Sequence, residues 1–222
     1  MQDSTPFDAA AARRFREALG LTPAHVAYGM RAAFGQHVDP RLVAAWEQGT
    51  MVPDERQLTA LAGALWCSPA HLLRAPRTLR EHRLARGVSA PDLALEIGMD
   101  PAEYERVEAT GRWTGDARQA EALARALRLA LPALLAFTGR EEELAGLLRR
   151  AVTTRWQAYA AAVARLVPVP RDRVEAALRT LHASYAAASA GSLNWAAGAH
   201  GPGAGPAYLD DVLRHFWAAL EA

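Results

Sequence analysis

The sequence predicts an all-α protein, and an internal repeat carries most of that prediction. Residues 56–73, RQLTALAGALWCSPAHLL, align without gaps on residues 118–135, RQAEALARALRLALPALL, and nine of the 18 positions are identical. Apolar residues recur at intervals of three and four, the period of a helix that is buried on one face. Strand-like alternation of polar and apolar residues is missing from the sequence. A unit that returns after 62 residues is longer than a solenoid repeat and indicates a duplicated domain.

Cap and turn residues place five short helices in each copy of the repeat. Ser, Thr or Asp before Pro opens several of them and Gly closes others, as helix starts and ends prefer. In the first copy we expect a frayed tail at 1–7, a looser stretch at 31–38 and helices at 8–19, 22–30, 39–49, 54–65 and 68–73. In the second copy we expect helices at 79–86, 90–97, 100–111, 116–129 and 132–137.

The C-terminal third leaves the repeat and shows apolar stripes at helical spacing. The first stripe is long, from Leu144 to Leu166, and ends before Pro168. Two shorter stripes and a Gly/Ala/Pro-rich loop are expected after it, at 174–185, 209–220 and 191–206. Faces this wide need a partner, which is either one another together with the repeats or a second subunit. The predicted domains are 8–75 (the first copy), 77–138 (the second copy) and a helical C-terminal domain at 141–222.

The composition narrows the class of protein. Of the 222 residues 51% are hydrophobic, enough to bury a core, and the 25 basic residues are all arginine, as in a GC-rich bacterial genome. A net charge of +1 points to no class of partner. The lone Cys67, expected to be a small buried apolar residue, excludes an internal disulfide and a cysteine-cage zinc site. Without a secretory signal or a long apolar run, we expect a cytoplasmic, nucleoid-associated protein that does not contact a membrane.

Four segments give the chain a family resemblance: FREALGLT at 15–22, LREHRLARGVS at 79–89, WEQG at 46–49 and VEATG at 107–111. With them the chain resembles the Xre family of phage-repressor and Cro-like DNA-binding domains, once in each copy. The resemblance implies five-helix helix-turn-helix domains, in which the second helix anchors on phosphates and the third enters the major groove. It also implies that Trp46 points into the core and that Glu47 holds a helix end. The first copy carries six extra residues between its second helix and its signature.

The first copy carries the residues that we expect to contact DNA. The family often places Gln directly after the cap of the second helix, where this chain has Pro23 in the first copy and Ala90 in the second. The expected DNA-binding residues lie at that cap, before the third helix, on it and just after it: Thr22, Arg31, Gln36, His37, Arg41, Gln48 and Thr50.

The third helix of the second copy is acidic. It carries four carboxylates against one arginine, at Asp100, Glu103, Glu105, Glu108 and Arg106. A helix with this charge repels the phosphate backbone. We therefore expect Glu103, Glu105 and Arg106 to bind a protein partner or to serve a structural role.

Other chemistry has little support in the sequence. The seven histidines lack the spacing of metal ligands, and nucleophile motifs and phosphate-binding loops are missing, so we expect no metal, no cofactor and no enzymatic activity. Aromatic residues of the last third could line a small-molecule pocket with Arg155 and His182 nearby: Trp156, Tyr159, Tyr185, Trp195, Phe216 and Trp217. Such residues at helical spacing are more often core.

These observations predict a sequence-specific transcriptional regulator. Its first copy would bind double-stranded DNA, and its C-terminal helices would pair two subunits on half-sites about 34 Å apart. Two alternatives stay open. The copies could form a protein-interaction scaffold that has lost DNA binding, or a small-molecule or protein effector could act at the C-terminal domain and release the DNA.

Overall fold

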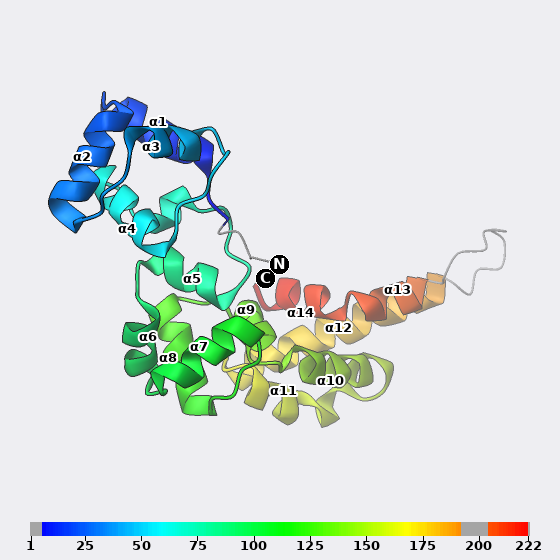
Figure 1. The fold of residues 1–222 in the computed structure, drawn as a ribbon. Coiled ribbons are helices and arrows are strands. Elements are labelled where there is room, and N and C mark those ends of the chain that lie inside the picture. Colours follow the sequence, from blue (N-terminus) through cyan, green and yellow to red (C-terminus); the bar gives the residue numbers. More distant parts are fainter. Residues whose placement is uncertain (1–5, 192–203, 222) are drawn as a thin grey trace. The chain divides into compact units, whose positions relative to one another are not determined.

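A computed structural model describes residues 6–191 and 204–221 and divides the chain into two compact units, 1–129 and 130–222. Apart from one isolated bridge, the regular structure of the described residues is helical (Figure 1). The predicted all-α class is confirmed. The first unit holds the first copy and most of the second, and the last helix of the second copy lies in the second unit.

The described part of the first unit consists of short helices with polar side chains at their starts. Thr22 Oγ1 accepts a hydrogen bond from the backbone N–H of His25, and Asp54 caps the N–H of Gln57. Such caps satisfy N–H groups that have no partner inside the helix. In chain order the helices are α1 (Ala9–Ala18), α2 (Pro23–Phe34), α3 (Pro40–Glu47), α4 (Glu55–Ala64), η1 (Pro69–Leu72), α5 (Leu79–Arg86), α6 (Ala90–Ile97), α7 (Pro101–Thr110) and α8 (Ala117–Leu127).

The N-terminal segment is part of the fold, so the expectation of a frayed tail through residue 7 is wrong at its end. Phe7 is buried in the core of the first copy and forms an antiparallel bridge with Leu73. Two backbone bonds flank it, from Asp8 N to the Leu72 carbonyl and from Arg74 N to the Pro6 carbonyl, both 2.8 Å long. A buried aromatic ring and paired backbone groups hold this segment in place. Residues 1–5 lie outside the described part of the chain.

Helix α2 runs one turn further than the sequence predicted, through Phe34 instead of Met30. The Phe34 ring lies against Gly63 of α4, where an added Cβ would come within 2.1 Å of the ring. The missing side chain at position 63 therefore makes room for the extra turn. Gly35 then ends α2 with a φ of 65°, in the left-handed region that glycine adopts readily.

The two copies share their backbone even where their residues differ. Trp66 follows α4 and Arg128 follows α8 at equivalent positions of the repeat, and both have a positive φ, 53° and 52°. This region is uncommon for residues other than glycine, so its recurrence reports a shared path of the chain. The large and the small core residue also change places between the copies. Val43 and Trp46 in α3 correspond to Tyr104 and Val107 in α7, and all four are buried.

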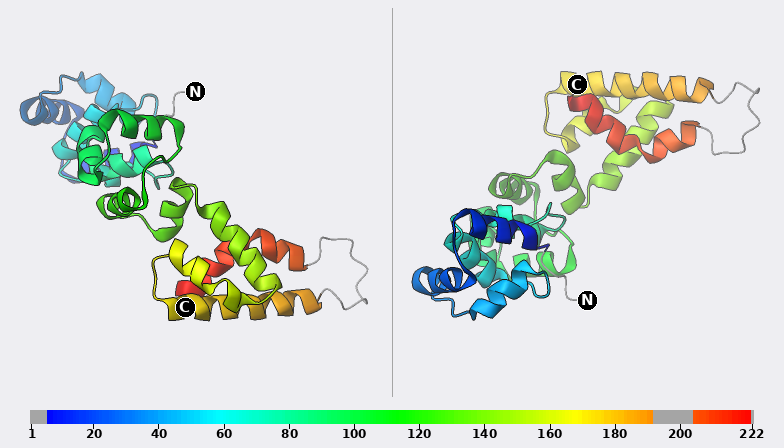
Figure 2. Two further views of the ribbon diagram at one scale, coloured as in Figure 1. Left: turned by 90° about the horizontal axis from the view of Figure 1, so that it is seen from below. Right: turned by 90° about the horizontal axis from the view of Figure 1, so that it is seen from above.

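The second unit is a bundle of helices around one apolar cluster. Its helices are α9 (Leu131–Phe137), α10 (Glu141–Thr153), η2 (Trp156–Ala158), α11 (Ala160–Leu166), α12 (Arg171–Gly191), α13 (Ala204–Asp210) and α14 (Val212–Glu221). Figure 2 shows α12 and α14 running along each other, and they share the cluster with α10. Leu144, Leu178 and Phe216 are fully buried in it. The C-terminal stripes therefore cover one another within this unit.

The single long helix predicted from Leu144 to Leu166 is wrong. Helix α10 ends at Thr153, and η2 and α11 follow as separate pieces. The hydroxyls of Thr153 and Thr154 both donate to backbone carbonyls of the preceding turn, at 2.8 and 2.6 Å. Threonine side chains that bond the backbone in this way compete with helix continuation. The predicted loop at 191–206 is shorter at both ends, because Gly191 belongs to α12 and α13 starts at Ala204, while 192–203 lie outside the described residues.

Candidate nucleic-acid interface

A partly buried ion pair fixes α3 against α1 in the first copy. Arg16 donates from Nε and Nη2 to the two carboxylate oxygens of Glu47, at 2.7 and 2.8 Å. Its Nη1 donates to the backbone carbonyl of Leu21, just before α2, at 2.8 Å. The fork geometry of arginine suits such a two-point contact. One guanidinium thus sets α3, the start of α2 and α1 relative to one another.

Glu47 is the last residue of α3, and its ion pair with Arg16 ties this helix end to α1. Its hydrogen bond is the main cause that raises the pKa of Arg16, ahead of the opposing effect of burial. Trp46, the preceding residue, points into the core as expected. Because the carboxylate of Glu47 is neutralised by Arg16, it adds little repulsion toward an anion on this face.

The same clamp occurs in the second copy, on Arg83. Its Nε and Nη2 donate to Glu108 at 2.7 and 3.0 Å, and its Nη1 donates to the carbonyl of Val88 at 2.8 Å. It also has a second carboxylate, Glu55 of α4, bonded to Nη1 and Nη2 at 2.5 and 3.1 Å. All five N–H groups of this guanidinium are therefore used. Since Glu55 lies in the first copy and Glu108 in the second, Arg83 joins the two copies.

The electrostatics of this joint follow from its burial. Arg83 is 2% exposed, which lowers its pKa, but its hydrogen bonds to Glu108 and Glu55 outweigh that effect and raise the pKa. Tyr104 donates its hydroxyl to Glu108 at 2.7 Å. Burial first, and then the charge of Glu108, raise the pKa of Tyr104. Arg83 and Tyr104 are therefore charged and neutral, respectively, throughout the range in which the protein would work.

An open hollow of about 410 Å³ lies between α2 and the start of α3 in the first copy. Tyr28, Arg31 and His37 line it together with Ala24, Ala27, Val38, Asp39 and Pro40. Tyr28 is 64% exposed, and the Arg31 guanidinium lies 5.6 Å from the centre of its ring. Stacking of this kind holds the cation in place at the surface.

The predicted DNA-binding residues of the first copy do not all share one face. Arg31 and His37 line the hollow of α2 and α3, and Arg41 is exposed at the start of α3. Thr22 is exposed as the cap of α2. Gln48 lies at the other end of α3, beside Arg16 and Glu47, and the Thr50 hydroxyl donates to the carbonyl of Ala45 at 3.0 Å. Gln36 lies apart from them, in a groove of about 310 Å³ lined by both copies.

The matching face of the second copy has a different chemistry. Leu95 on α6, at the position of Tyr28, is 71% exposed. Glu103 accepts a hydrogen bond from the Thr114 hydroxyl at 2.7 Å, so part of its carboxylate is engaged within the chain. Glu105 and Arg106 are exposed on α7. Helix α7 is therefore acidic, as the sequence predicted, and α6 exposes an apolar side chain where α2 has Tyr28.

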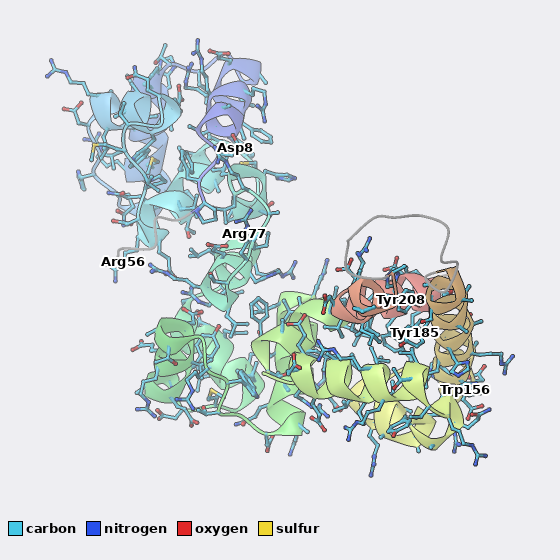
Figure 3. The ribbon with its side chains drawn as sticks, turned by 90° about the vertical axis from the view of Figure 1, so that its right-hand side faces the viewer. Asp8, Arg56, Arg77, Trp156, Tyr185 and Tyr208 are labelled. Carbon is cyan, nitrogen blue, oxygen red and sulfur yellow. The ribbon has the colours of Figure 1, made fainter. Side chains whose placement is uncertain are left out.

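Within the described residues, the predicted aromatic side chains of the last third do not line one common pocket. Figure 3 shows Tyr185 beside Tyr208, whose ring centres are 5.9 Å apart, whereas Trp156 lies under the Arg179 guanidinium at 5.6 Å. Phe216 is buried in the core. Arg155 is exposed, and His182 contacts the carbonyl of Thr154 at 3.2 Å. Trp195 lies outside the described residues.

The described residues contain no group of His, Cys, Asp and Glu side chains that could hold a metal ion. None of their helices is long and apolar enough to cross a membrane.

Sequence reasoning missed Arg16 and Arg83, although one signal could have found them. The two arginines lie 67 positions apart, at the same place in the repeat. The signature further along each copy contains a glutamate, Glu47 in the first copy and Glu108 in the second. An arginine and a carboxylate retained in both copies of a diverged repeat form a candidate ion pair. Glu55 carries no such signal, because the second copy has Ala117 at the equivalent position.

Comparison with protein-family models, curated proteins and solved structures found no match.

Proposed function

We propose that the chain is a DNA-binding transcriptional regulator whose first copy docks α3 in the major groove. The observation that carries this proposal is the charge contrast between equivalent helices. Leu42 and Ala44 of α3 stand where α7 has Glu103 and Glu105, and Glu47 is neutralised by Arg16. The first copy therefore offers a face whose unpaired charges include Arg31 and Arg41, while the second offers carboxylates.

In the proposed mechanism α2 contacts the phosphate backbone and α3 contacts the bases. Thr22 caps α2, and the N–H groups and dipole at that end attract phosphate. Arg41 on the first turn of α3 is placed to meet base edges, because recognition helices contact bases mainly through their N-terminal residues. Arg31, held against Tyr28, supplies a second cation for the backbone.

Pairing of two chains belongs to the proposal as a separate part. A contact set with two unpaired arginines is weak, and two linked sites raise the apparent affinity. In the second unit the apolar stripes cover one another, so this unit offers less apolar surface for pairing than the sequence suggested. Light scattering across a range of concentrations tests the pairing, and a monomer at every concentration would remove it from the mechanism.

The experiment for DNA binding is fluorescence anisotropy with the upstream region of the protein's own gene, at two salt concentrations and against random DNA. Arg41→Ala should weaken binding about tenfold, the ratio that corresponds to about 1.4 kcal/mol. Arg106→Ala, on the helix of the second copy, is the matched control and should leave the affinity unchanged or slightly higher. Absence of binding at low salt, or equal effects of the two variants, would contradict the proposal.

A second candidate function is supported by Leu95 and the acidic α7. An exposed apolar side chain on α6 and exposed charges on the acidic α7 are typical of a surface that a basic protein partner covers. In this case the chain is an interaction scaffold built on the repeat. Leu95→Ser would then weaken complex formation with that partner, and Arg41→Ala would not. A DNA-binding regulator predicts instead that Arg41→Ala weakens DNA binding and that Leu95→Ser leaves it unchanged.

A further inference from the structure

A hollow of about 240 Å³ lies over Arg16 in the first copy. It is separate from the hollow of Tyr28 and His37 and is lined by Arg13, Arg16, Pro23, Ala44, Glu47 and Gln48. The described residues give the Arg16 guanidinium three hydrogen bonds, two to Glu47 and one to Leu21. A guanidinium has five donors. Two of its N–H groups therefore have no hydrogen bond among the described residues, and Nη2 also forms an ion pair of 3.6 Å with the exposed Glu17.

The second copy contains the counterpart of this hollow, with a volume of about 430 Å³. Each of the six residues around Arg16 has its repeat equivalent in the lining of that larger hollow: Arg80, Arg83, Ala90, Glu105, Glu108 and Ala109. The offset between the copies is 67 residues up to Pro23 and 61 from Ala44 to Gln48, because α2 is four residues longer than α6 and the loop after it is two residues longer. One site has thus been duplicated with the domain.

The counterpart is occupied by a carboxylate from outside the second copy. Glu55, the first residue of α4, places both its oxygens on Arg83, at 2.5 and 3.1 Å. It comes from a helix start, directly after the cap Asp54. The second copy therefore shows that the remaining N–H groups of this clamp donate to a carboxylate, and that this carboxylate lies at the start of a helix.

The lining of the hollow over Arg16 has fewer carboxylates than the lining of its counterpart. Ala44 replaces Glu105, so one carboxylate at the rim is missing. Gln48 replaces Ala109 and adds an amide that can donate a hydrogen bond. Arg13 lies at the rim and pairs with Glu17, an exposed contact of 2.7 Å that costs little to rearrange.

We infer that the hollow over Arg16 is a docking site for a protein carboxylate at the first turn of a helix, presented by an acidic partner protein in the way that Glu55 reaches Arg83. The carboxylate accepts from the two free N–H groups of Arg16, and the helix start packs against Pro23 and Ala44. A phosphate of DNA has the same charge sign, but the occupied counterpart holds a carboxylate on a helix. This site is independent of whether Arg41 reads DNA.

The test follows the side-chain Nε–Hε signals of arginine by NMR in the unmodified chain. The probes are acetate, chloride as the ionic-strength control, and a peptide of residues 53–66, which carries the start of α4. Acetate and the peptide should each shift the Arg16 signal to saturation and leave Arg83 unmoved, since Glu55 fills its site. The peptide with Glu55→Gln should bind at least about tenfold more weakly, the ratio for a lost charge-assisted hydrogen bond.

The protein also supplies a positive control. In the Glu55→Gln variant of the whole chain, Arg83 loses its second carboxylate and its signal should become sensitive to acetate. An Arg16 signal that moves no further with acetate than that of the exposed Arg14 would overturn the inference. So would an Arg16 signal that saturates with a short DNA duplex and does not respond to the peptide, because the hollow would then serve a phosphate.

Discussion

The joint between the two copies makes a prediction that double-mutant cycles can measure. Arg83 contacts Glu55, and Arg16, its equivalent in the repeat, does not. Substituting Arg83→Met keeps the aliphatic stem and removes the ion pairs with Glu55 and Glu108. Arg16→Met removes the pair with Glu47 in the same type of clamp and a longer, exposed pair with Glu17. Combining each with Glu55→Ala therefore isolates the contact that crosses between the copies.

The structure sets the expected sizes. Either arginine variant leaves a carboxylate that is 8–9% exposed, Glu47 or Glu108, and breaking such a buried pair costs about 3–5 kcal/mol of unfolding free energy. Glu55 is 33% exposed, so its pair with Arg83 is partly screened and should contribute about 1–2 kcal/mol. The coupling free energy between Glu55→Ala and Arg83→Met should therefore be about 1–2 kcal/mol, and that with Arg16→Met close to zero.

Urea denaturation followed by circular dichroism provides the unfolding free energies. Arg83→Lys, which keeps the charge but loses the fork, serves as a milder variant if Arg83→Met is too unstable to measure. Equal coupling in the two cycles, or coupling below about 0.5 kcal/mol with Arg83, would refute the claim that this arginine joins the copies.

Three further predictions address single residues. Gly63→Ala should stabilise the first unit by about 0.5–1 kcal/mol more in a Phe34→Ala background than in the native chain, because in the native chain the new methyl displaces the Phe34 ring. Thermal unfolding measures both effects, and equal effects would contradict this packing. Burial raises the pKa of the Cys67 thiol from 9.0 to about 11, so its alkylation at pH 8 should be about 100-fold slower folded than unfolded, and a rate profile with a midpoint near 9 would count against this. Burial, opposed by the charge of Glu81, lowers the pKa of His82; the unfolded chain then binds a proton more readily, so stability should fall below about pH 6.5, and His82→Gln should flatten that dependence in urea titrations.

Helix starts were predictable because their causes are local. Thr22, Asp54 and Asp116 bind backbone N–H groups three residues on, and such a contact depends on neighbours in the sequence alone. The end of α2 was not predictable in this way. Its last turn is stabilised by Phe34 against Gly63, two positions that no local pattern connects.

The candidate site was predictable in part, for a related reason. Arg31 and Arg41 are cations beside helices whose capped starts can be read from the sequence, so the sequence identifies them as candidate DNA contacts. Gln36 was grouped with them because it is close in sequence, yet it faces the groove between the copies. Its direction is set by the longer α2, which the sequence did not reveal.

Duplication followed by divergence explains why the first copy and most of the second now form one unit. The clamp of arginine, glutamate and backbone carbonyl is present in both, so it predates their separation in role. Glu55 added a second carboxylate to Arg83, which filled one site and tied the copies together, while Ala44 and Gln48 left the site on Arg16 open. Loss of Arg16 would lower stability whether or not the open site binds an anion. Ala44→Glu keeps Arg16 and its pair with Glu47 but adds a carboxylate at the rim, so it separates anion binding from stability. It should leave the unfolding free energy within about 0.5 kcal/mol, as surface changes do, and abolish the acetate response of Arg16.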